Sequence, residues 1–363
     1  MKVGILGAGQ LARMLALAGI PRGIKFVFYD PNPESCAAQL GVFICAEYDD
    51  YKKLDYFVSQ VDVVSIESEN IPVETLKYLQ EHVDVHPGPD AVLTSQDRLL
   101  EKTFFKRLKI PTPEYYVIDS ADQLEEVAHQ HDGKLIVKTR RFGYDGKGQA
   151  ILTKPGQANE IWHDLGAQSL IAEQCMDFTR EASLISVRSQ QGNVQYYPLT
   201  QNLHRNGILI KSHSILDDSL QSVAEDYAER VLSELNYVGV LGFEFFVCNE
   251  TLVANEIAPR VHNSGHWTIE GAATSQFENH LRAILDLPLG STNALSECTM
   301  YNLIGTMPDS RIIMNLKNAR LHDYGKSPRA NRKLGHITLC DPSPEDLSTV
   351  ESIIRQIDTT REI

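Results

Sequence analysis

The stretch GVLGFEFFVCNETLVANEIAPR, residues 239–260, has two apolar segments around the polar turn Asn249-Glu250-Thr251 and predicts a β-hairpin. Glu244 lies six residues before Glu250, and Glu256 lies six residues after it. In an antiparallel register centred on Glu250, the two carboxylates face each other, where like charges destabilise the pairing. A cation between them would remove that repulsion, and carboxylate oxygens without an adjacent His or Cys favour Mg²⁺ that bridges nucleotide phosphates over zinc. The alternative is a slipped register with one glutamate exposed.

A second segment, KLIVKTRRFGYDGKGQAILT at 134–153, has an apolar strand on each side of a glycine-rich loop. Glycines let the backbone approach phosphate oxygens and present its N–H groups to them. The segment lacks the GK[ST] sequence and the following helix of a P-loop, so it predicts a different kind of phosphate site. The alternative is an ordinary hairpin with a basic face. The glycines are Gly143, Gly146 and Gly148, and the cations are Lys138, Arg140, Arg141 and Lys147.

Three further polar segments predict ligand contacts, weakly when each is taken alone. In SLIAEQCMDFTREASL (169–184), Glu173 and the carbonyls after it suit an adenine amine, and Glu181 suits ribose hydroxyls. The run APRVHNSGHW (258–267) leads from the hairpin into a helix start, which is a natural anion site. KSPRANRKLGH (326–336) carries four fixed positive charges and no acid, which indicates a phosphate-bearing substrate in an acidic chain. The alternatives are solvated surface and, for the histidines, structural hydrogen bonds.

The N-terminal GILGAGQLARM (Gly4–Met14) places a short strand before the G-x-G-x-x-G/A pattern of a dinucleotide-binding turn. Gly7, Gly9 and Ala12 take the three pattern positions, and Asp30 lies 30 − 9 = 21 residues after the middle glycine. Such folds place the carboxylate that holds a ribose at this distance. Alone, this match predicts an NAD-dependent dehydrogenase. The later segments offer no hydride-transfer site beyond isolated histidines, which argues against that reading.

The composition bounds the class of protein. The chain has 363 residues, 42% of them hydrophobic and 23% charged, which suits two or three packed domains. A net charge of −14 argues against a nucleic-acid or anionic-membrane surface. The six cysteines are scattered without a C-x-x-C pair, which favours free thiols in a reducing compartment. Arg13 interrupts the N-terminal apolar run, and no segment reaches the roughly 18 apolar residues of a membrane span. We therefore expect a cytoplasmic protein.

The pattern of elements changes near residue 96. Up to about residue 95, strands and helices alternate, which predicts a parallel, doubly wound sheet. This region includes an acidic-ended strand at 61–70, a helix at 72–82 and a strand at 83–89. A helix capped by Ser95 is expected at 95–108, followed by a proline-marked connector at 110–118.

Beyond that connector, strand-like segments dominate and predict an α+β region with largely antiparallel sheets. Two helices stand out at 217–236 and 274–287, and a smaller strand-rich tail after Pro288 ends in a helix near 344–357.

Taken together, these segments resemble the ATP-grasp superfamily, and most closely its N5-carboxyaminoimidazole ribonucleotide synthetase family of purine biosynthesis. The resemblance runs in order from residue 1 to about 340, and NEIAPRVHNSGHW and FGYDGKGQ are its most specific parts. The other segments that carry it are GILGAGQLARM, SIESENIP, QDRLLEK, IVKTRRFGYDGKGQ, EQCMDFTRE, PLTQNLHRNGI and GFEFF.

The resemblance implies a mixed α/β and α+β chain in three parts. A Rossmann-like parallel sheet is expected at 1–95 and a two-lobed ATP-grasp domain at 96–290, with its smaller lobe at about 111–185. A small β-rich domain is expected at 291–363.

The implied activity of this carbon–nitrogen ligase couples ATP cleavage to bicarbonate activation. Carboxyphosphate, or CO₂ derived from it, carboxylates the exocyclic amine of 5-aminoimidazole ribonucleotide, and ADP and phosphate are released. The resemblance implies ATP with Mg²⁺ (or Mn²⁺), a homodimer, and neither a nucleic-acid nor a membrane partner.

Motif matching also implies roles for individual residues. ATP is expected to contact Arg98, Lys138, Gly143, Tyr144, Asp145, Gly146, Lys147, Gly148, Gln149, Glu173, Gln174, Cys175, Met176, Glu181, His204, Asn255 and Glu256, with Glu244 and Glu256 as metal ligands. The ribonucleotide is expected to contact Gly9, Gln10, Leu11, Glu69, Asn70, His262, Asn263, Ser264, Lys326, Arg332 and Lys333. The catalytic residues are expected to be Tyr144, Asp145, Lys147, Arg260 and Lys333. Ile66, Ser68 and Ala12 depart from the family pattern around the ribose site.

Four alternatives stay open at this point. Within the superfamily they are a formate-dependent glycinamide ribonucleotide transformylase and a biotin carboxylase. Outside it they are the NAD-dependent dehydrogenase and a non-catalytic nucleotide-binding module. The last is disfavoured because metal, phosphate and substrate segments are all present.

Overall fold

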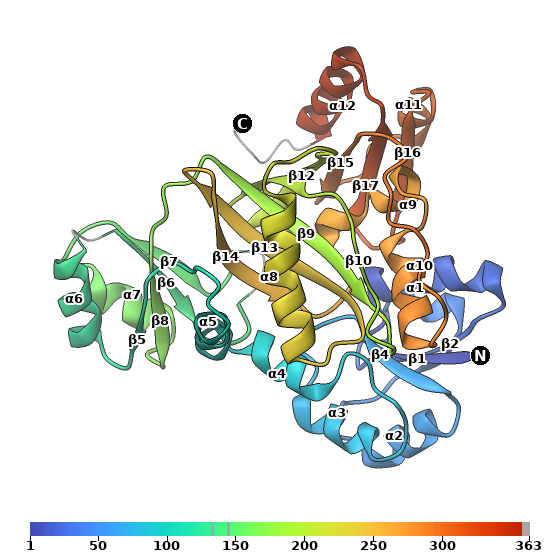
Figure 1. Ribbon diagram of the computed structural model, residues 1–363, viewed down its shortest axis with the longest axis horizontal. Coiled ribbons are helices and arrows are strands. Elements are labelled where there is room, and N and C mark those ends of the chain that lie inside the picture. The colour runs from blue at the N-terminus through green and yellow to red at the C-terminus, as the bar shows by residue number, and fades with distance from the viewer. Residues whose placement is uncertain (132–133, 144–145, 358–363) are drawn as a thin grey trace.

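The computed structural model describes residues 1–131, 134–143 and 146–357. Its strands form three sheets (Figure 1). A small lobe with α6 and α7 lies at one end of the molecule, and a long sheet crosses the middle. The N-terminal sheet and the C-terminal elements lie at the other end. Among the described helices, none combines the length and the apolar character needed to cross a membrane.

The N-terminal sheet is wholly parallel in the order β3-β2-β1-β4, as the alternation predicted. The predicted strand at 83–89 is wrong, because only Val85 pairs, in a single bridge to Val64. Pro87 and Pro89 lack the N–H groups that would continue a ladder. The elements are β1 (Lys2–Leu6), α1 (Gln10–Gly19), β2 (Lys25–Tyr29), β3 (Val42–Ile44), α2 (Tyr51–Val58), β4 (Val63–Ile66) and α3 (Val73–Gln80), with short 3₁₀ turns at Ile20–Arg22 and Ala38–Leu40.

The predicted helix at 95–108 corresponds to α5 (Arg98–Arg107), and the helix α4 (Pro89–Gln96), which the sequence pattern missed, ends just before it. Asp97 separates them in an extended conformation and caps α5, since its carboxylate accepts the N–H of Leu99 at 2.9 Å. The expected cap Ser95 instead donates to the carbonyl of Val92. Asp97 is the better cap because its carboxylate is anionic and lies at the positive end of α5.

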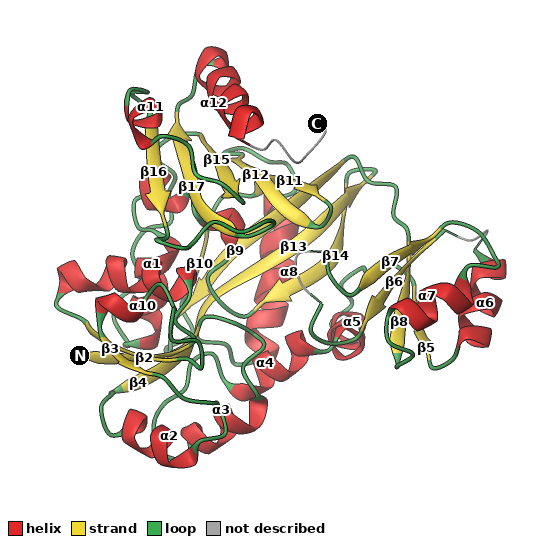
Figure 2. Cartoon of the chain, turned by 180° about the vertical axis from the view of Figure 1, so that it is seen from behind, coloured by secondary structure: helices red, strands yellow, loops and turns green. Residues whose placement is uncertain are grey.

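The small lobe is an antiparallel sheet in the order β5-β8-β6-β7 (Figure 2). Its core packs side chains of α6 and α7 against the sheet. The sequence pattern missed α6, α7 and β5, the last of which lies inside the expected connector at 110–118. The bounds are β5 (Tyr115–Ile118), α6 (Ala121–Gln130), β6 (Leu135–Thr139), β7 (Gln149–Leu152), α7 (Ala158–Asp164) and β8 (Leu170–Gln174).

The largest sheet has nine strands in the order β14-β13-β9-β11-β12-β15-β17-β16, with β10 paired to β9. Side chains of β9 alternate between its faces. Leu184 packs with α5 and α8, whereas Ile185 packs with α1 and α10. The strands are β9 (Arg180–Arg188), β10 (Val194–Tyr196), β11 (Thr200–Arg205), β12 (Ile208–Ser214), β13 (Gly239–Cys248), β14 (Thr251–Ala258), β15 (Cys298–Ile304), β16 (Ala319–Asp323) and β17 (Lys333–Cys340).

The C-terminal segment continues this same sheet, because β15 pairs directly with β12. The predicted helices at 217–236, 274–287 and 344–357 correspond to α8, α10 and α12. The remaining elements are α8 (Gln221–Glu234), a 3₁₀ turn at Asn263–Gly265, α9 (Thr268–Gly271), α10 (Gln276–Ile284), α11 (Ser310–Met314) and α12 (Pro344–Ile357).

Candidate active site

The β13–β14 hairpin sets Glu244 directly opposite Glu256, as predicted. The turn itself differs from the prediction. It has two residues, Asn249 and Glu250, with φ of 47° and 59°, which is the backbone of a type I′ turn. Such a turn would place Glu244 opposite Asn255. A β-bulge opposite Glu244 and Phe245 adds one residue, Asn255, on β14, and the two carboxylates therefore meet.

Each of the two glutamates has a cationic or imidazole partner. Glu256 accepts from Arg98 Nη1 at 3.0 Å, and Glu244 Oε1 lies 3.1 Å from His262 Nε2. Burial opposes the ionisation of Glu244, but the hydrogen bond from His262 and the nearby charges lower its pKa to about 2. Glu244 is therefore a carboxylate at neutral pH.

Helix α5 holds the bulged strand through three side chains on one face. Arg98 binds Glu256, Glu101 Oε1 accepts the N–H of Ile257 at 2.8 Å, and Lys102 Nζ donates to the carbonyl of Asn255 at 2.6 Å. Glu101 and Lys102 are 2% and 1% exposed. Burial, reinforced by the charge of Glu256, raises the pKa of Glu101 to about 8. The sequence interpretation named only Arg98, although the spacing i, i+3, i+4 in RLLEK indicates one helix face.

Lys138, on β6, forms a buried ion pair with Glu173, on β8. Lys138 Nζ lies 2.9 Å from Glu173 Oε2, and Lys102 Nζ lies 3.6 Å from the same oxygen. Burial opposes ionisation, but the two ammonium groups lower the pKa of Glu173 to about 2. Glu173 Oε1 is buried without a hydrogen-bond partner among the described residues. Gln174 and Cys175, at the end of β8, are exposed, and Met176 is half-buried.

The glycine-rich loop is anchored to the start of α5. Arg140 forms a bidentate pair with Asp97 at 3.1 and 2.6 Å, and its carbonyl accepts the N–H of Arg98. Gly146, at φ 77°, approaches the backbone so closely that a Cβ would lie 2.2 Å from the carbonyl oxygen of Asn206. The predicted Tyr144 and Asp145 lie outside the described residues. The other predicted loop residues, Gly143, Lys147, Gly148 and Gln149, lie between β6 and the start of β7.

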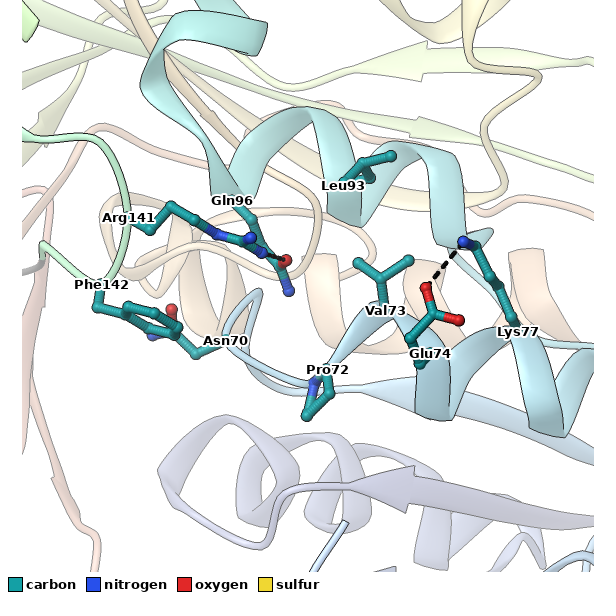
Figure 3. Close-up of a pocket in the computed structure, with 9 residues that line it drawn as sticks. All are labelled: Asn70, Pro72, Val73, Glu74, Lys77, Leu93, Gln96, Arg141 and Phe142. Carbon is teal, nitrogen blue, oxygen red and sulfur yellow. Dashed lines mark hydrogen bonds and ion pairs between the residues drawn. The ribbon is translucent and has the colours of Figure 1, made fainter. Parts of the chain in front are cut away.

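A cavity joins the N-terminal sheet, α5, the glycine-rich loop and the end of β14. Glu69, Arg98, Arg140, Glu256 and His262 are among its lining residues. A larger pocket of about 330 Å³ adjoins it and shares the walls Asn70, Gln96 and Phe142. Figure 3 shows Arg141, from the loop, bonded to Gln96 of α4 beside this pocket.

Two predicted ligand residues bind each other at the cavity wall. Arg260 donates to both oxygens of Glu69, at 2.5 and 3.0 Å. Glu181 likewise accepts from the backbone N–H and Nδ1 of His204, at 3.2 and 2.9 Å. These predicted residues are thus brought together, and each pair holds its side chains in one orientation.

The N-terminal glycine turn is occupied by a side chain that the sequence interpretation missed. Glu67, at the end of β4, accepts the N–H groups of Gly9 at 2.5 Å and Ala12 at 3.0 Å. Asp30 accepts the N–H of Ala8 at 2.8 Å and that of Asn32 at 2.7 Å. The phosphate site and the ribose carboxylate of a dinucleotide fold are both satisfied within the chain, which argues against the dehydrogenase.

The structure also places the remaining predicted substrate residues. Lys326 Nζ contacts Gln10 Oε1, which joins the basic loop, residues 326–336, to the N-terminal glycine turn. Lys333, at the start of β17, acts electrostatically on both Glu244 and His204. Leu11 and Ser264 are buried, Asn263 exchanges two hydrogen bonds with Asn302, and Arg332 donates to the carbonyl of Ser327.

Comparison with known proteins agrees with this geometry. Three family models match the chain: a ribonucleotide synthetase preATP-grasp domain at 1–96, an ATP-grasp domain at 103–277, and a phosphoribosylaminoimidazole carboxylase C-terminal domain at 298–349. An N5-carboxyaminoimidazole ribonucleotide synthase from Pseudomonas aeruginosa is 46% identical and covers 99% of each chain.

Solved structures give the same result. The crystal structure of N5-carboxyaminoimidazole ribonucleotide synthetase from Thermus thermophilus is 44% identical, with a TM-score of 0.93 over 99% of both chains. An Aspergillus clavatus N5-carboxyaminoimidazole synthase in complex with ADP and 5-aminoimidazole ribonucleotide is 28% identical, with a TM-score of 0.89 over 98% and 99% of the two chains. The chain belongs to the N5-carboxyaminoimidazole ribonucleotide synthase family of ATP-grasp enzymes.

Proposed function

We propose that the protein uses ATP and bicarbonate to carboxylate 5-aminoimidazole ribonucleotide to N5-carboxyaminoimidazole ribonucleotide, through carboxyphosphate, with release of ADP and phosphate. The observation that carries this proposal is the pair Glu244 and Glu256, opposed on neighbouring strands beside the cations Arg98 and Lys138. Two acidic side chains opposed on neighbouring strands favour a cation between them, and a transferred phosphate needs the cations beside them.

The side chains present fit Mg²⁺, with Mn²⁺ as an alternative. Glu244 and Glu256 supply carboxylate oxygens, and Asn255 Oδ1 is buried without a partner among the described residues. Such an all-oxygen set suits a hard divalent cation, which would stabilise charge on the transferred phosphoryl group. No group of three or more His, Cys, Asp or Glu side chains in the described ranges could hold a metal by itself. Nucleotide phosphates would therefore have to supply the remaining ligands of the ion.

The rest of the ATP site is assigned in the same way. Glu173 Oε1, the unpartnered buried oxygen, suits the adenine amine, with Gln174, Cys175 and Met176 beside it. The Glu181–His204 pair suits the ribose. Lys138, Arg98 and the N–H groups of the glycine-rich loop (Gly143, Gly146, Lys147, Gly148 and Gln149) would neutralise the phosphates.

For the ribonucleotide, we propose the region between the glycine turn and the basic loop. Gly9, Gln10, Glu69, Asn70, Lys326, Arg332 and Lys333 would surround it. Arg260, which lines the cavity beside Glu256 together with His262, would hold the anionic bicarbonate-derived intermediate. Enclosure matters because carboxyphosphate must be kept from water. We further propose that the chain divides into three parts at about residues 95 and 290. We also propose that it forms a homodimer in the cytoplasm. Sedimentation analysis tests the homodimer.

The deciding experiment measures phosphate release. We expect release that requires ATP, Mg²⁺, bicarbonate and 5-aminoimidazole ribonucleotide together. No release with all four components present would refute the proposal. Replacing bicarbonate by formate, and 5-aminoimidazole ribonucleotide by glycinamide ribonucleotide, tests the transformylase alternative. Replacing 5-aminoimidazole ribonucleotide by biotin, with bicarbonate kept, tests the biotin carboxylase alternative. A thermal-shift comparison of NAD with ATP and Mg²⁺ tests the dehydrogenase, because only a bound ligand raises the melting temperature.

A further inference from the structure

A chain of buried hydrogen bonds runs from β12 to His262, whose Nε2 lies 3.1 Å from a carboxylate oxygen of Glu244. Its middle consists of Asn202 on β11, Ser183 on β9 and Ser264 after β14, which we call the hydroxyl–amide string. Ser183 and Ser264 are fully buried, and Asn202 is 5% exposed. The contacts are Ser212 Oγ to Asn202 Oδ1 at 2.9 Å, Asn202 Nδ2 to Ser183 Oγ at 3.0 Å, Ser183 Oγ to Ser264 Oγ at 2.6 Å, Ser264 Oγ to His262 Nδ1 at 2.8 Å, and His262 Nε2 to Glu244 Oε1 at 3.1 Å.

The sheet register explains why these groups meet. Ser183 lies directly opposite Glu244 in the β9–β13 pairing, and Asn202 lies directly opposite Ser212 in the β11–β12 pairing. The imidazole of His262 packs against β13 at Gly242, where a Cβ would lie only 2.6 Å from the Cβ of His262. The string therefore lies in one layer, between the sheet and the segment that follows β14.

In such a string, each hydroxyl, amide or imidazole group can donate to the neighbour on one side and accept from the other, so the hydrogen bonds can run in either of two directions. The backbone N–H of Ser264 decides between them, because it can only donate and it is directed at His262 Nδ1, 3.4 Å away. His262 Nδ1 is therefore an acceptor, and the proton of the neutral imidazole lies on Nε2. Ser264 then donates to His262, Ser183 donates to Ser264, and the Asn202 amide donates to Ser183. Each buried polar group in the string thus has its partner.

We propose that Asn202, Ser183 and Ser264 are positioning residues that hold His262 in the Nε2–H form, so that it donates to Glu244. The inference deepens the proposed function, since Glu244 is there a metal ligand. With one oxygen of Glu244 oriented by His262, its second oxygen is available to the metal. The opposite direction would set the lone pair of Nε2 against the carboxylate, which is repulsive. Loss of a group bonded directly to a metal ligand, the place His262 has beside Glu244, typically changes metal affinity or activity by about 10–100-fold.

Asn202→Asp is the sharpest variant, because it has nearly the same shape but a carboxylate that only accepts. Ser183 must then turn its proton toward position 202, and the string reverses. We would label the full chain with ¹⁵N in its imidazole rings and record long-range ¹H–¹⁵N spectra without metal or nucleotide. The His262 signals are assigned by their loss in His262→Asn. We expect the proton on Nε2 in the unmodified protein, and a shift of the population toward Nδ1–H in Asn202→Asp.

Ser183→Ala provides a second variant that buries no charge. Its matched control is Ser186→Ala, since Ser186 is a fully buried serine of the same strand whose hydroxyl donates to the carbonyl of Leu241, outside the string. We expect Ser183→Ala to raise the Mg²⁺ concentration for half-maximal phosphate release by about threefold or more, which is less than for a direct partner of the metal ligand. Ser183→Thr, which keeps the hydroxyl, should return this Mg²⁺ concentration to that of the unmodified protein. Ser186→Ala should leave it unchanged.

The two measurements, the imidazole spectra and the Mg²⁺ dependence of phosphate release, separate this inference from the proposed function. A proton on Nδ1 of His262 in the unmodified protein would overturn the inference. So would a Mg²⁺ requirement in Ser183→Ala equal to that of Ser186→Ala. An Nε2–H form in a protein that releases no phosphate with all substrates present would support the tautomer assignment and overturn the proposed function.

Discussion

The carboxylate of Glu67 accepts the backbone N–H of Gly9 at 2.5 Å and so fills the N-terminus of α1 with an anion from the chain itself. In a dinucleotide-binding protein, that position receives a phosphate. Here the glycines make room for the side chain of Glu67, the residue that follows β4. A Cβ on Gly7 would lie 2.3 Å from Glu67 Cγ, and one on Gly9 would lie 2.6 Å from Glu67 Oε1. The same turn that suggests a cofactor from its sequence therefore serves to join β1, α1 and β4.

Gly9→Ala should destabilise the protein because its Cβ overlaps Glu67. We expect a loss of about 1–3 kcal/mol in the free energy of unfolding, measured by urea denaturation. Gly88→Ala is the control, since a Cβ there meets nothing within 4 Å. A loss in Gly9→Ala no larger than in this control would contradict the assigned contact.

Glu256→Gln should abolish turnover while leaving the fold intact. The substitution keeps the shape but removes the charge that a divalent cation needs, and we expect kcat to fall by about 100-fold or more, as when a group that stabilises transition-state charge is lost. Glu250→Gln, in the exposed turn of the same hairpin, should keep full activity. Circular dichroism and the melting temperature check that the fold is intact. A Glu256→Gln variant with normal activity would contradict the assignment of Glu256 as a metal ligand.

Lys102→Met should destabilise the protein through two partners at once. It leaves the carbonyl of Asn255 without its donor and removes one cation from the buried Glu173. Breaking a buried pair on one side typically costs about 3–5 kcal/mol, and urea unfolding should show a loss of that order. Lys106→Met, at an exposed position one turn later in α5, should change little. Equal losses in the two variants would show that the contacts of Lys102 add nothing.

The pH dependence of stability should report the ion pairs of Glu173. Its pKa is about 2 in the folded protein, against 4.5 for an unperturbed glutamate, so its ionisation stabilises the fold fully above pH 4.5. That contribution is lost as the pH falls toward 2. The difference in unfolding free energy between the unmodified protein and Glu173→Gln should therefore shrink over this interval. Glu160→Gln, on the exposed surface of α7, is the matched control, and a constant difference for Glu173→Gln over this interval would refute the assignment.

The hairpin shows how far sequence reasoning can reach. A turn centred on Glu250 predicts the opposition of Glu244 and Glu256, and the pairing is confirmed although that turn is wrong. The one-residue error in the turn is cancelled by the bulge at Asn255. Neither feature is visible in a count of residues, because the bulge depends on contacts from α5, which lies more than 140 residues earlier in the chain.

Other features were missed for two different reasons. The role of Glu67 depends on backbone groups 58 positions away, and an acidic residue at a strand end gives no local sign of them. The β11–β12 hairpin did have a local sign, since Asn206-Gly207 is a dipeptide typical of type I′ turns, and both residues have positive φ. The hydroxyl–amide string has no sequence signature, because its serines and asparagine come from separate strands.

The pairing of β15 with β12 makes the last third of the large sheet a continuation of the ATP-grasp strands. If the chain were cut ahead of Cys298, β12 would keep a row of unpaired N–H and C=O groups open to other molecules. Chains truncated before Cys298 should therefore self-associate through the exposed edge of β12 and should not give a smaller active enzyme. Anyone grafting a foreign tail onto this scaffold would have to supply a strand that matches the edge residue for residue.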